Sequence, residues 1–172
     1  GKLNLNFDPT KPLIIFYYRG MDECTKNSMA TRKSKLQWDA ELLKKIKKIT
    51  DVNILRLYKN KEGIKTLKDY DWQKDPNALI ENLFFNYHYN CGSFVVLSKE
   101  KYASFFSEYS HDEVLINLGY LVKKYNRSYT ERFYFYFSVY ELLNSSKFSC
   151  NSSPVYYIKE CIDIIRSAVL VV

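Results

Sequence analysis

Glycine, proline and histidine are scarce in this chain of 172 residues, which contains 5, 4 and 2 of them. So few glycines leave no loop that cradles a phosphate, and no Gly-x-Ser-x-Gly turn presents a serine nucleophile. His88 and His111 have no metal-ligand spacing to each other or to the cysteines, so no metal site is predicted. Without such motifs we expect no cofactor, and the sequence favours a role other than catalysis.

A long apolar run is also missing. No stretch approaches the roughly 18 residues that a membrane-spanning helix needs, and the first residues show no signal-peptide pattern. The apolar share of 47% and the charged share of 26% are close to the averages for folded proteins. We therefore expect a single domain over residues 1–172, with no transmembrane segment.

Aromatic residues are abundant, with 16 tyrosines and 11 phenylalanines. They alternate over residues 132–140, and this period of two predicts a strand whose faces differ. The first face is predicted to lie in the core and consists of Phe133, Phe135, Phe137 and Val139. The second face presents hydroxyl groups and is a candidate binding surface: Tyr134, Tyr136 and Tyr140.

Positive charge is concentrated in the first part of the chain. Residues 1–70 carry 16 Lys/Arg and 8 Asp/Glu, whereas residues 71–172 carry 10 and 11. This asymmetry suggests an acidic partner, nucleic acid or an anionic surface; a solvated helix face is the alternative. The candidate contacts are the lysines of one predicted helix: Lys44, Lys45, Lys47 and Lys48.

The first half of the chain predicts a parallel crossover unit. Residues 12–18 form a short apolar run typical of a strand buried on both faces. Ser34 and Gln37 have capping-box spacing and predict the start of a helix there. Its apolar face consists of Trp38, Leu42, Ile46 and Ile49. Residues 52–58 return to strand character, which completes the unit.

Further elements predict an α/β domain with a mixed sheet flanked by helices. Asp75-Pro76 predicts a second helix start, with Leu79, Leu83 and Tyr87 on its apolar face. Residues 93–98 suit a strand, and Ser110 with Glu113 forms another capping box. Ser153-Pro154 predicts the last helix.

Four cysteines permit two disulfides. Cys24 follows the first strand and Cys91 precedes the third, and such connections often meet at one end of a sheet. The candidate bridges are Cys24–Cys91 and Cys150–Cys161. Buried free thiols are the alternative, because free cysteine is among the most buried residue types.

The order of elements over residues 12–98 resembles that of the thioredoxin fold. In that family the loop after the first of these strands carries Cys-x-x-Cys, and a cis-proline precedes the later strand. Here Cys24 has no cysteine at that spacing, and Cys91-Gly92-Ser93 contains no proline. The resemblance therefore implies a structural Cys24–Cys91 bridge or a redox-inactive binding domain rather than the usual dithiol exchange.

The leading functional hypothesis is a non-catalytic protein-binding domain, because tyrosine is enriched at interfaces. The alternatives are the thioredoxin-like domain and an RNA-binding domain that uses the basic half and the strand tyrosines. Three glycosylation sequons favour the secretory pathway, and they begin at Asn126, Asn144 and Asn151.

Overall fold

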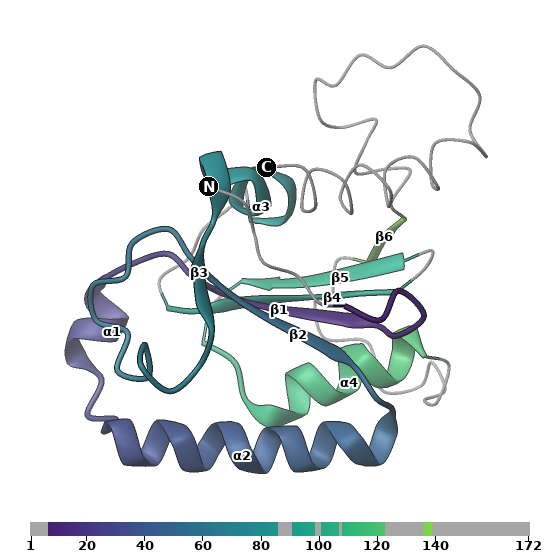
Figure 1. The fold of residues 1–172 in the computed structure, drawn as a ribbon, viewed down its shortest axis with the longest axis horizontal. Coiled ribbons are helices and arrows are strands. Elements are labelled where there is room, and N and C mark those ends of the chain that lie inside the picture. The colour runs from purple at the N-terminus through teal and green to yellow at the C-terminus, as the bar shows by residue number, and fades with distance from the viewer. Residues whose placement is uncertain (1–6, 86–90, 99–100, 107, 123–135, 139–172) are drawn as a thin grey trace.

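The computed structural model describes residues 7–85, 91–98, 101–106 and 108–122, together with the backbone of residues 136–138. A mixed sheet runs through this part of the chain in the strand order β3-β2-β1-β4-β5-β6 (Figure 1). β1, β2 and β3 are parallel, whereas β4, β5 and β6 each pair antiparallel with the preceding strand in that order. The strands are β1 (Leu13–Tyr18), β2 (Asn53–Tyr58), β3 (Trp72–Lys74), β4 (Ser93–Leu97), β5 (Lys101–Phe106) and β6 (Tyr136–Ser138).

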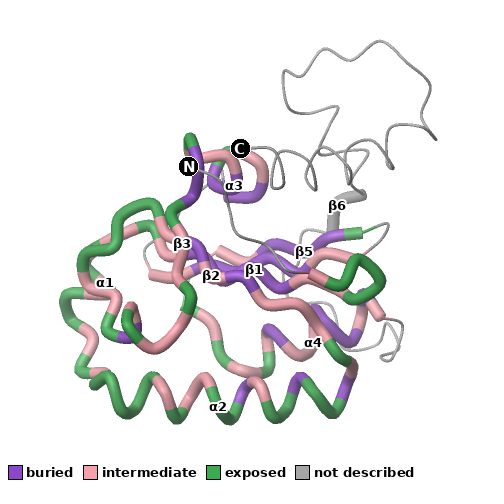
Figure 2. Tube along the Cα trace, in the orientation of Figure 1, coloured by how far each residue is buried: buried purple, intermediate pink, exposed green. Residues whose placement is uncertain are grey.

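Strand β1 lies inside the sheet and is buried on both faces (Figure 2). Its successive side chains point to opposite faces, so Ile14 and Phe16 join one core while Ile15 and Tyr17 join the other. This explains why its sequence is continuously apolar and does not alternate. The strand predicted at residues 12–18 is confirmed.

Helices cover both faces of the sheet. α2 (Arg32–Ile49) and α4 (His111–Leu121) run along one face, and α3 (Leu79–Phe84) lies on the other (Figure 1). The short α1 (Glu23–Asn27) precedes α2 at one end of the sheet. The predicted α/β architecture, a mixed sheet flanked by helices, is confirmed.

The capping boxes of α2 and α4 test two predicted helix starts. α4 begins as predicted, and the Ser110 amide donates to Glu113 Oε2 at 2.7 Å. α2 instead begins earlier, at the N-cap Thr31, because Ser34 is the residue that completes the box from inside the first turn. The predicted start of α2 at Ser34 is therefore wrong. Its buried face is confirmed at Leu42, Ile46 and Ile49, with Trp38 packed against the same core.

The face of α3 that is buried against the sheet differs from the apolar face that was predicted. Ile80, Glu81 and Phe84 are buried, whereas Leu79 and Leu83 are only partly so. The predicted start is confirmed only for a short 3-10 turn, Pro76–Ala78, which has Asp75 as its N-cap and Pro76 in its first turn. Asn77 and Ala78 adopt left-handed backbone angles, with φ of 52° and 54°, and these break the helix before Leu79. The third residue of that face, Tyr87, lies outside the described residues.

The element order from β1 to β4 is the one that the thioredoxin resemblance predicts: strand, cysteine-bearing segment, long helix, strand, helix, strand. Within this range strand β3 is additional, and β5 lies beyond it. None of the helices in the described part of the chain combines the length and apolarity that a membrane crossing requires. Apart from the β6 backbone, the strand predicted at 132–140 and the helix predicted after Pro154 lie outside the described residues.

Candidate functional site

A disulfide joins Cys24 to Cys91 at one end of the sheet. β4 runs antiparallel to β1, so the amino end of β4 lies beside the carboxyl end of β1, where Tyr17 pairs with Ser93. Cys24 lies in α1, shortly after β1, and Cys91 lies two residues before the start of β4. The two Cα atoms are 5.3 Å apart, within the usual range for a disulfide. The predicted Cys24–Cys91 bridge is confirmed in the structure.

Asp22 links the same two segments through hydrogen bonds. Its Oδ1 accepts from the Thr25 amide at 2.8 Å and from Thr25 Oγ1 at 2.7 Å, which caps α1. Its Oδ2 accepts from the Cys91 amide at 2.7 Å. Burial raises the pKa of Asp22, but these hydrogen bonds outweigh it and hold the pKa below its usual value. Asp22 is therefore a charged anchor beside the disulfide.

A second carboxylate approaches the disulfide from a third segment. Glu108 lies between β5 and α4, and one of its oxygens lies within 4.8 Å of both sulfur atoms. Reactive cysteines are typically found beside positive charge. The two carboxylates described above, Asp22 and Glu108, supply negative charge instead. This environment does not favour a nucleophilic thiol.

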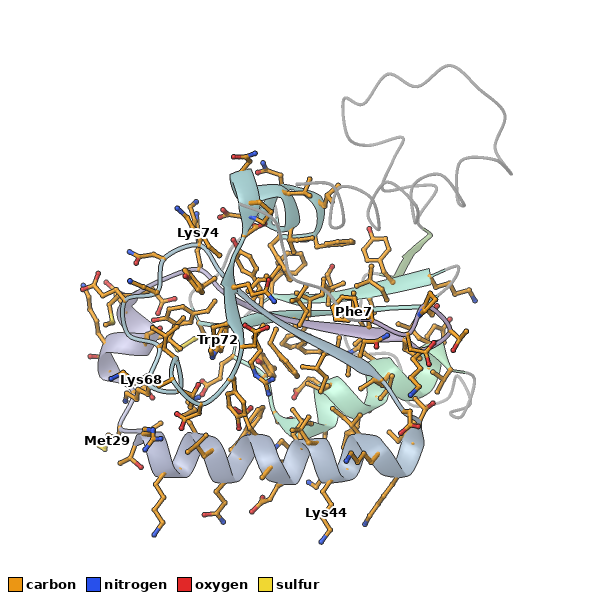
Figure 3. The ribbon with its side chains drawn as sticks, viewed as in Figure 1. Phe7, Met29, Lys44, Lys68, Trp72 and Lys74 are labelled. Atoms are coloured by element: carbon orange, nitrogen blue, oxygen red, sulfur yellow. A yellow bond between two sulfur atoms is a disulfide. The ribbon has the colours of Figure 1, made fainter. Side chains whose placement is uncertain are left out.

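The loop that contains Cys24 also presents two exposed apolar side chains. We call residues 19–30 the cysteine loop. Met21 is 36% exposed and Met29 is 97% exposed, and these are the exposed large hydrophobic residues of the described part of the chain. In Figure 3, Met29 projects outward beside the start of α2. Sequence reasoning missed both residues, because a lone methionine carries no pattern that indicates exposure.

The backbone on each side of Met29 is held by Lys65. The Lys65 ammonium donates to the Ser28 carbonyl at 3.2 Å and also to the Ala30 carbonyl. The segment that carries Lys65 is itself connected to β1, since the Tyr18 hydroxyl donates to the Glu62 carbonyl at 2.8 Å. Met29 is therefore exposed on a loop whose backbone has several fixed contacts.

The predicted lysine and tyrosine sites have different outcomes. Lys44, Lys45, Lys47 and Lys48 are all exposed on α2, and Lys44 points away from the sheet (Figure 3). Lys45 Nζ lies 3.2 Å from His111 Nδ1. Tyr136 belongs to β6, at one edge of the sheet, but its side chain, Tyr134 and Tyr140 lie outside the described residues. The same holds for Cys150, Cys161 and the sequon residues Asn126, Asn144 and Asn151.

A buried acidic cluster lies on the α3 face of the sheet. Asp75 Oδ2 accepts from the Tyr17 hydroxyl at 3.2 Å and from the Glu81 amide at 3.0 Å, and Oδ1 accepts from the Ile80 amide at 3.1 Å. Burial raises the pKa of Asp75, and burial followed by the Asp75 charge raises that of Tyr17. These bonds tie the first turn of α3 to β1, so we assign the cluster a structural role.

The Glu81 carboxylate, with a side chain only 8% exposed, belongs to the same cluster. Lys59 Nζ lies 2.9 Å from its Oε2, and Arg19 Nε lies 3.3 Å from its Oε1. Both cations are half exposed, so solvent screens the pairs and limits their contribution to stability. The pairs compensate the buried charge of Glu81.

The chain's own residues are the basis for any functional assignment. Comparisons with protein-family models, curated proteins and solved structures return no match.

Proposed function

We propose that the protein is a non-catalytic protein-binding domain whose partner contacts the cysteine loop. The observation that supports this is the position of the methionines. The chain has two, and both lie in this loop with 36% and 97% of their surface exposed. Methionine is adaptable and is frequently used at binding surfaces. An exposed methionine on an anchored loop is therefore a suitable contact residue.

The anchoring of the loop favours binding for an entropic reason. Ordering a flexible loop on association opposes affinity, and a loop that is already fixed avoids this loss. The Cys24–Cys91 disulfide and the Lys65 hydrogen bonds provide such constraints on either side of Met29. A redox-inactive thioredoxin-like binding domain, as the sequence resemblance implies, would use its disulfide in this way.

Charge around the loop favours an acidic partner. Lys26, Lys33 and Lys68 are exposed in or near the segments that surround Met29. Complementary charge steers association and contributes to specificity more than to affinity. We expect the partner to present an apolar pocket for methionine bordered by aspartate or glutamate side chains.

Met29→Ser is expected to weaken binding of the partner about tenfold, because a buried apolar anchor contributes on the order of 1.4 kcal/mol. The partner is captured by a photo-crosslinking residue at position 29, identified by mass spectrometry, purified and titrated by calorimetry. Lys44→Ser is the matched control, since Lys44 is exposed on the outward side of α2.

Isotope labelling of the methionine methyl groups gives an independent test, because the chain has only two methionines. The Met29 signal should shift or broaden when the purified partner is added. Two results together would exclude the cysteine loop as the contact surface. The first is unchanged affinity in a Met21→Ser/Met29→Ser variant, and the second is wild-type methyl signals that do not change when the partner is added.

Nucleic-acid binding is the second candidate, and the exposure of four lysines on α2 favours it. Under this alternative, single-stranded RNA binds at low salt and its affinity falls steeply as salt is raised. Replacing Lys44, Lys45, Lys47 and Lys48 together by alanine should abolish that binding. A filter-binding or anisotropy series that shows no RNA binding at low salt would reject it, because phosphate contacts are strongest there.

A further inference from the structure

Cys24, Cys91 and Glu108 form the one group of potential metal ligands found in the described part of the chain. They come from α1, from the segment before β4 and from the segment before α4, so only the fold brings them together. Their ligand atoms all lie within 4.8 Å of one another. We propose that reduction of the Cys24–Cys91 disulfide converts this group into a zinc site.

The positions of the backbone suit a metal ion as well as a disulfide. A tetrahedral zinc ion with Zn–S bonds of about 2.3 Å holds two sulfur atoms about 3.8 Å apart. Cα atoms separated by 5.3 Å allow two cysteine side chains to reach that spacing by rotation about their own bonds. The Glu108 carboxylate is exposed, so it can turn toward the ion with little rearrangement.

The donor set matches the preference of zinc for thiolate and carboxylate ligands. Reduction adds two electrons and two protons to the disulfide, and a dithiol reductant becomes a disulfide in exchange. Zn²⁺ then displaces both thiol protons. Two thiolates and one carboxylate leave a complex of net charge −1, with the fourth position open to water, as in zinc sites with three protein ligands.

Asp22 would orient one of these ligands. Its Oδ1 accepts from Thr25 and its Oδ2 from the Cys91 amide at 2.7 Å, so its oxygens are engaged and it is not counted as a ligand. A hydrogen bond to the backbone of a ligating residue fixes the direction in which that residue presents its ligand atom. This bond is present with Cys91 in the disulfide, and it would hold the backbone of Cys91 in the metal-bound form as well.

The consequence is that two different links can hold the same two segments. Under oxidising conditions the disulfide ties the cysteine loop to β4, and under reducing conditions zinc does so. The loop would then keep its position in either environment. This inference concerns the cysteines and Glu108, and it does not depend on whether Met29 contacts a partner.

Metal binding is tested with the full chain carrying Cys150→Ser and Cys161→Ser, so that Cys24 and Cys91 are its only thiols. The protein is reduced with a water-soluble trialkylphosphine, freed of reductant without air, and titrated with Co²⁺ and then Zn²⁺. We expect about one equivalent of Co²⁺ to produce a thiolate charge-transfer band, which Zn²⁺ abolishes. The oxidised protein should produce no band.

Glu108→Gln tests the third ligand and should weaken zinc affinity about tenfold or more, measured by competition with a chromophoric chelator. Glu23→Gln is the matched control, because Glu23 is an exposed carboxylate next to Cys24 in α1. Equal affinity for both variants would overturn the role of Glu108. Absence of the band in the reduced protein would overturn the site itself.

A second measurement does not depend on the serine variants. In the reduced four-cysteine chain, zinc should protect Cys24 and Cys91 from alkylation, which peptide mass spectrometry maps residue by residue. Alkylation of these two residues at the same rate with and without zinc would refute the proposal.

Discussion

Replacing Cys24 and Cys91 together by alanine is expected to lower the free energy of unfolding of the oxidised protein by about 4 kcal/mol. The two residues are separated by 67 positions, so the disulfide closes a long loop in the unfolded chain and restricts its entropy. The loss should appear as a lower urea midpoint by circular dichroism. The slope of the transition should rise, because the unfolded state becomes less compact.

Position 91 provides an internal control for this prediction. Cys91 has a φ of 82°, in the left-handed region that favours glycine. A Cys24→Ala/Cys91→Gly variant should therefore be more stable than the double-alanine variant by up to about 1 kcal/mol, as the backbone strain at this position is relieved. If the double-alanine variant unfolds at the same urea concentration as the oxidised wild type, the disulfide does not constrain the unfolded chain as we expect.

The central part of the fold could be predicted because its sequence signals are local. The run at residues 12–18 is apolar at every position inside the strand, and α2 has apolar residues at helical spacing. The meeting of Cys24 with Cys91 is a long-range feature. It followed from a topological rule, since connections that leave one strand and enter its neighbour meet at the same end of the sheet.

Strands β3 and β5 were missed for different reasons. β3 is an edge strand of three residues, too short for a periodic pattern. β5 follows β4 through a turn in which the Ser98 amide donates to the Lys101 carbonyl at 2.8 Å. No Gly-containing pair of the kind that marks a hairpin occurs between residues 98 and 101. Neither strand therefore has a strong local signal.

The sequence predicted the two cysteines of the candidate site, but not Glu108 or the exposure of Met29. The cysteines could be found by their position relative to strands, but Glu108 is a single acid with no spacing relation to either of them. It joins the group through the packing of β5 and α4. The exposure of Met29 likewise depends on Lys65, which holds the flanking carbonyls from 35 and 37 residues away in sequence.

Asp75→Ala is expected to destabilise the protein by about 3 kcal/mol, because it removes the acceptor for three donors in a buried environment. Those donors are the Tyr17 hydroxyl and the amides of Ile80 and Glu81. Asp71→Ala is the matched control. Asp71 is exposed and accepts only a local bond from Gln73, so its loss should change stability by no more than about 0.5 kcal/mol. Equal effects in urea unfolding would contradict a structural role for Asp75.

Asp75→Asn removes the titrating carboxyl group at this position, and its amide also leaves only one acceptor oxygen for the three donors, so the informative quantity is the pH dependence of stability. Burial raises the pKa of Asp75 above the usual 3.8, so the folded protein binds a proton here more tightly than the unfolded chain does. The resulting stabilisation is fully present below pH 3.8 and is lost as pH rises through the raised pKa. Wild type should therefore gain stability relative to Asp75→Asn as pH falls from neutral toward 3.8.

The opposite trend is expected from the carboxyl groups of Asp22, Asp69 and Glu113, whose pKa values are lowered in the folded protein. Their contribution is present above their unfolded pKa values and is lost in acid. Wild type and Asp75→Asn both contain these groups. Their effect therefore cancels when the unfolding free energy of one protein is subtracted from that of the other. A difference in unfolding free energy that stays constant across this pH range would show that Asp75 is not buried as a carboxylate with a raised pKa.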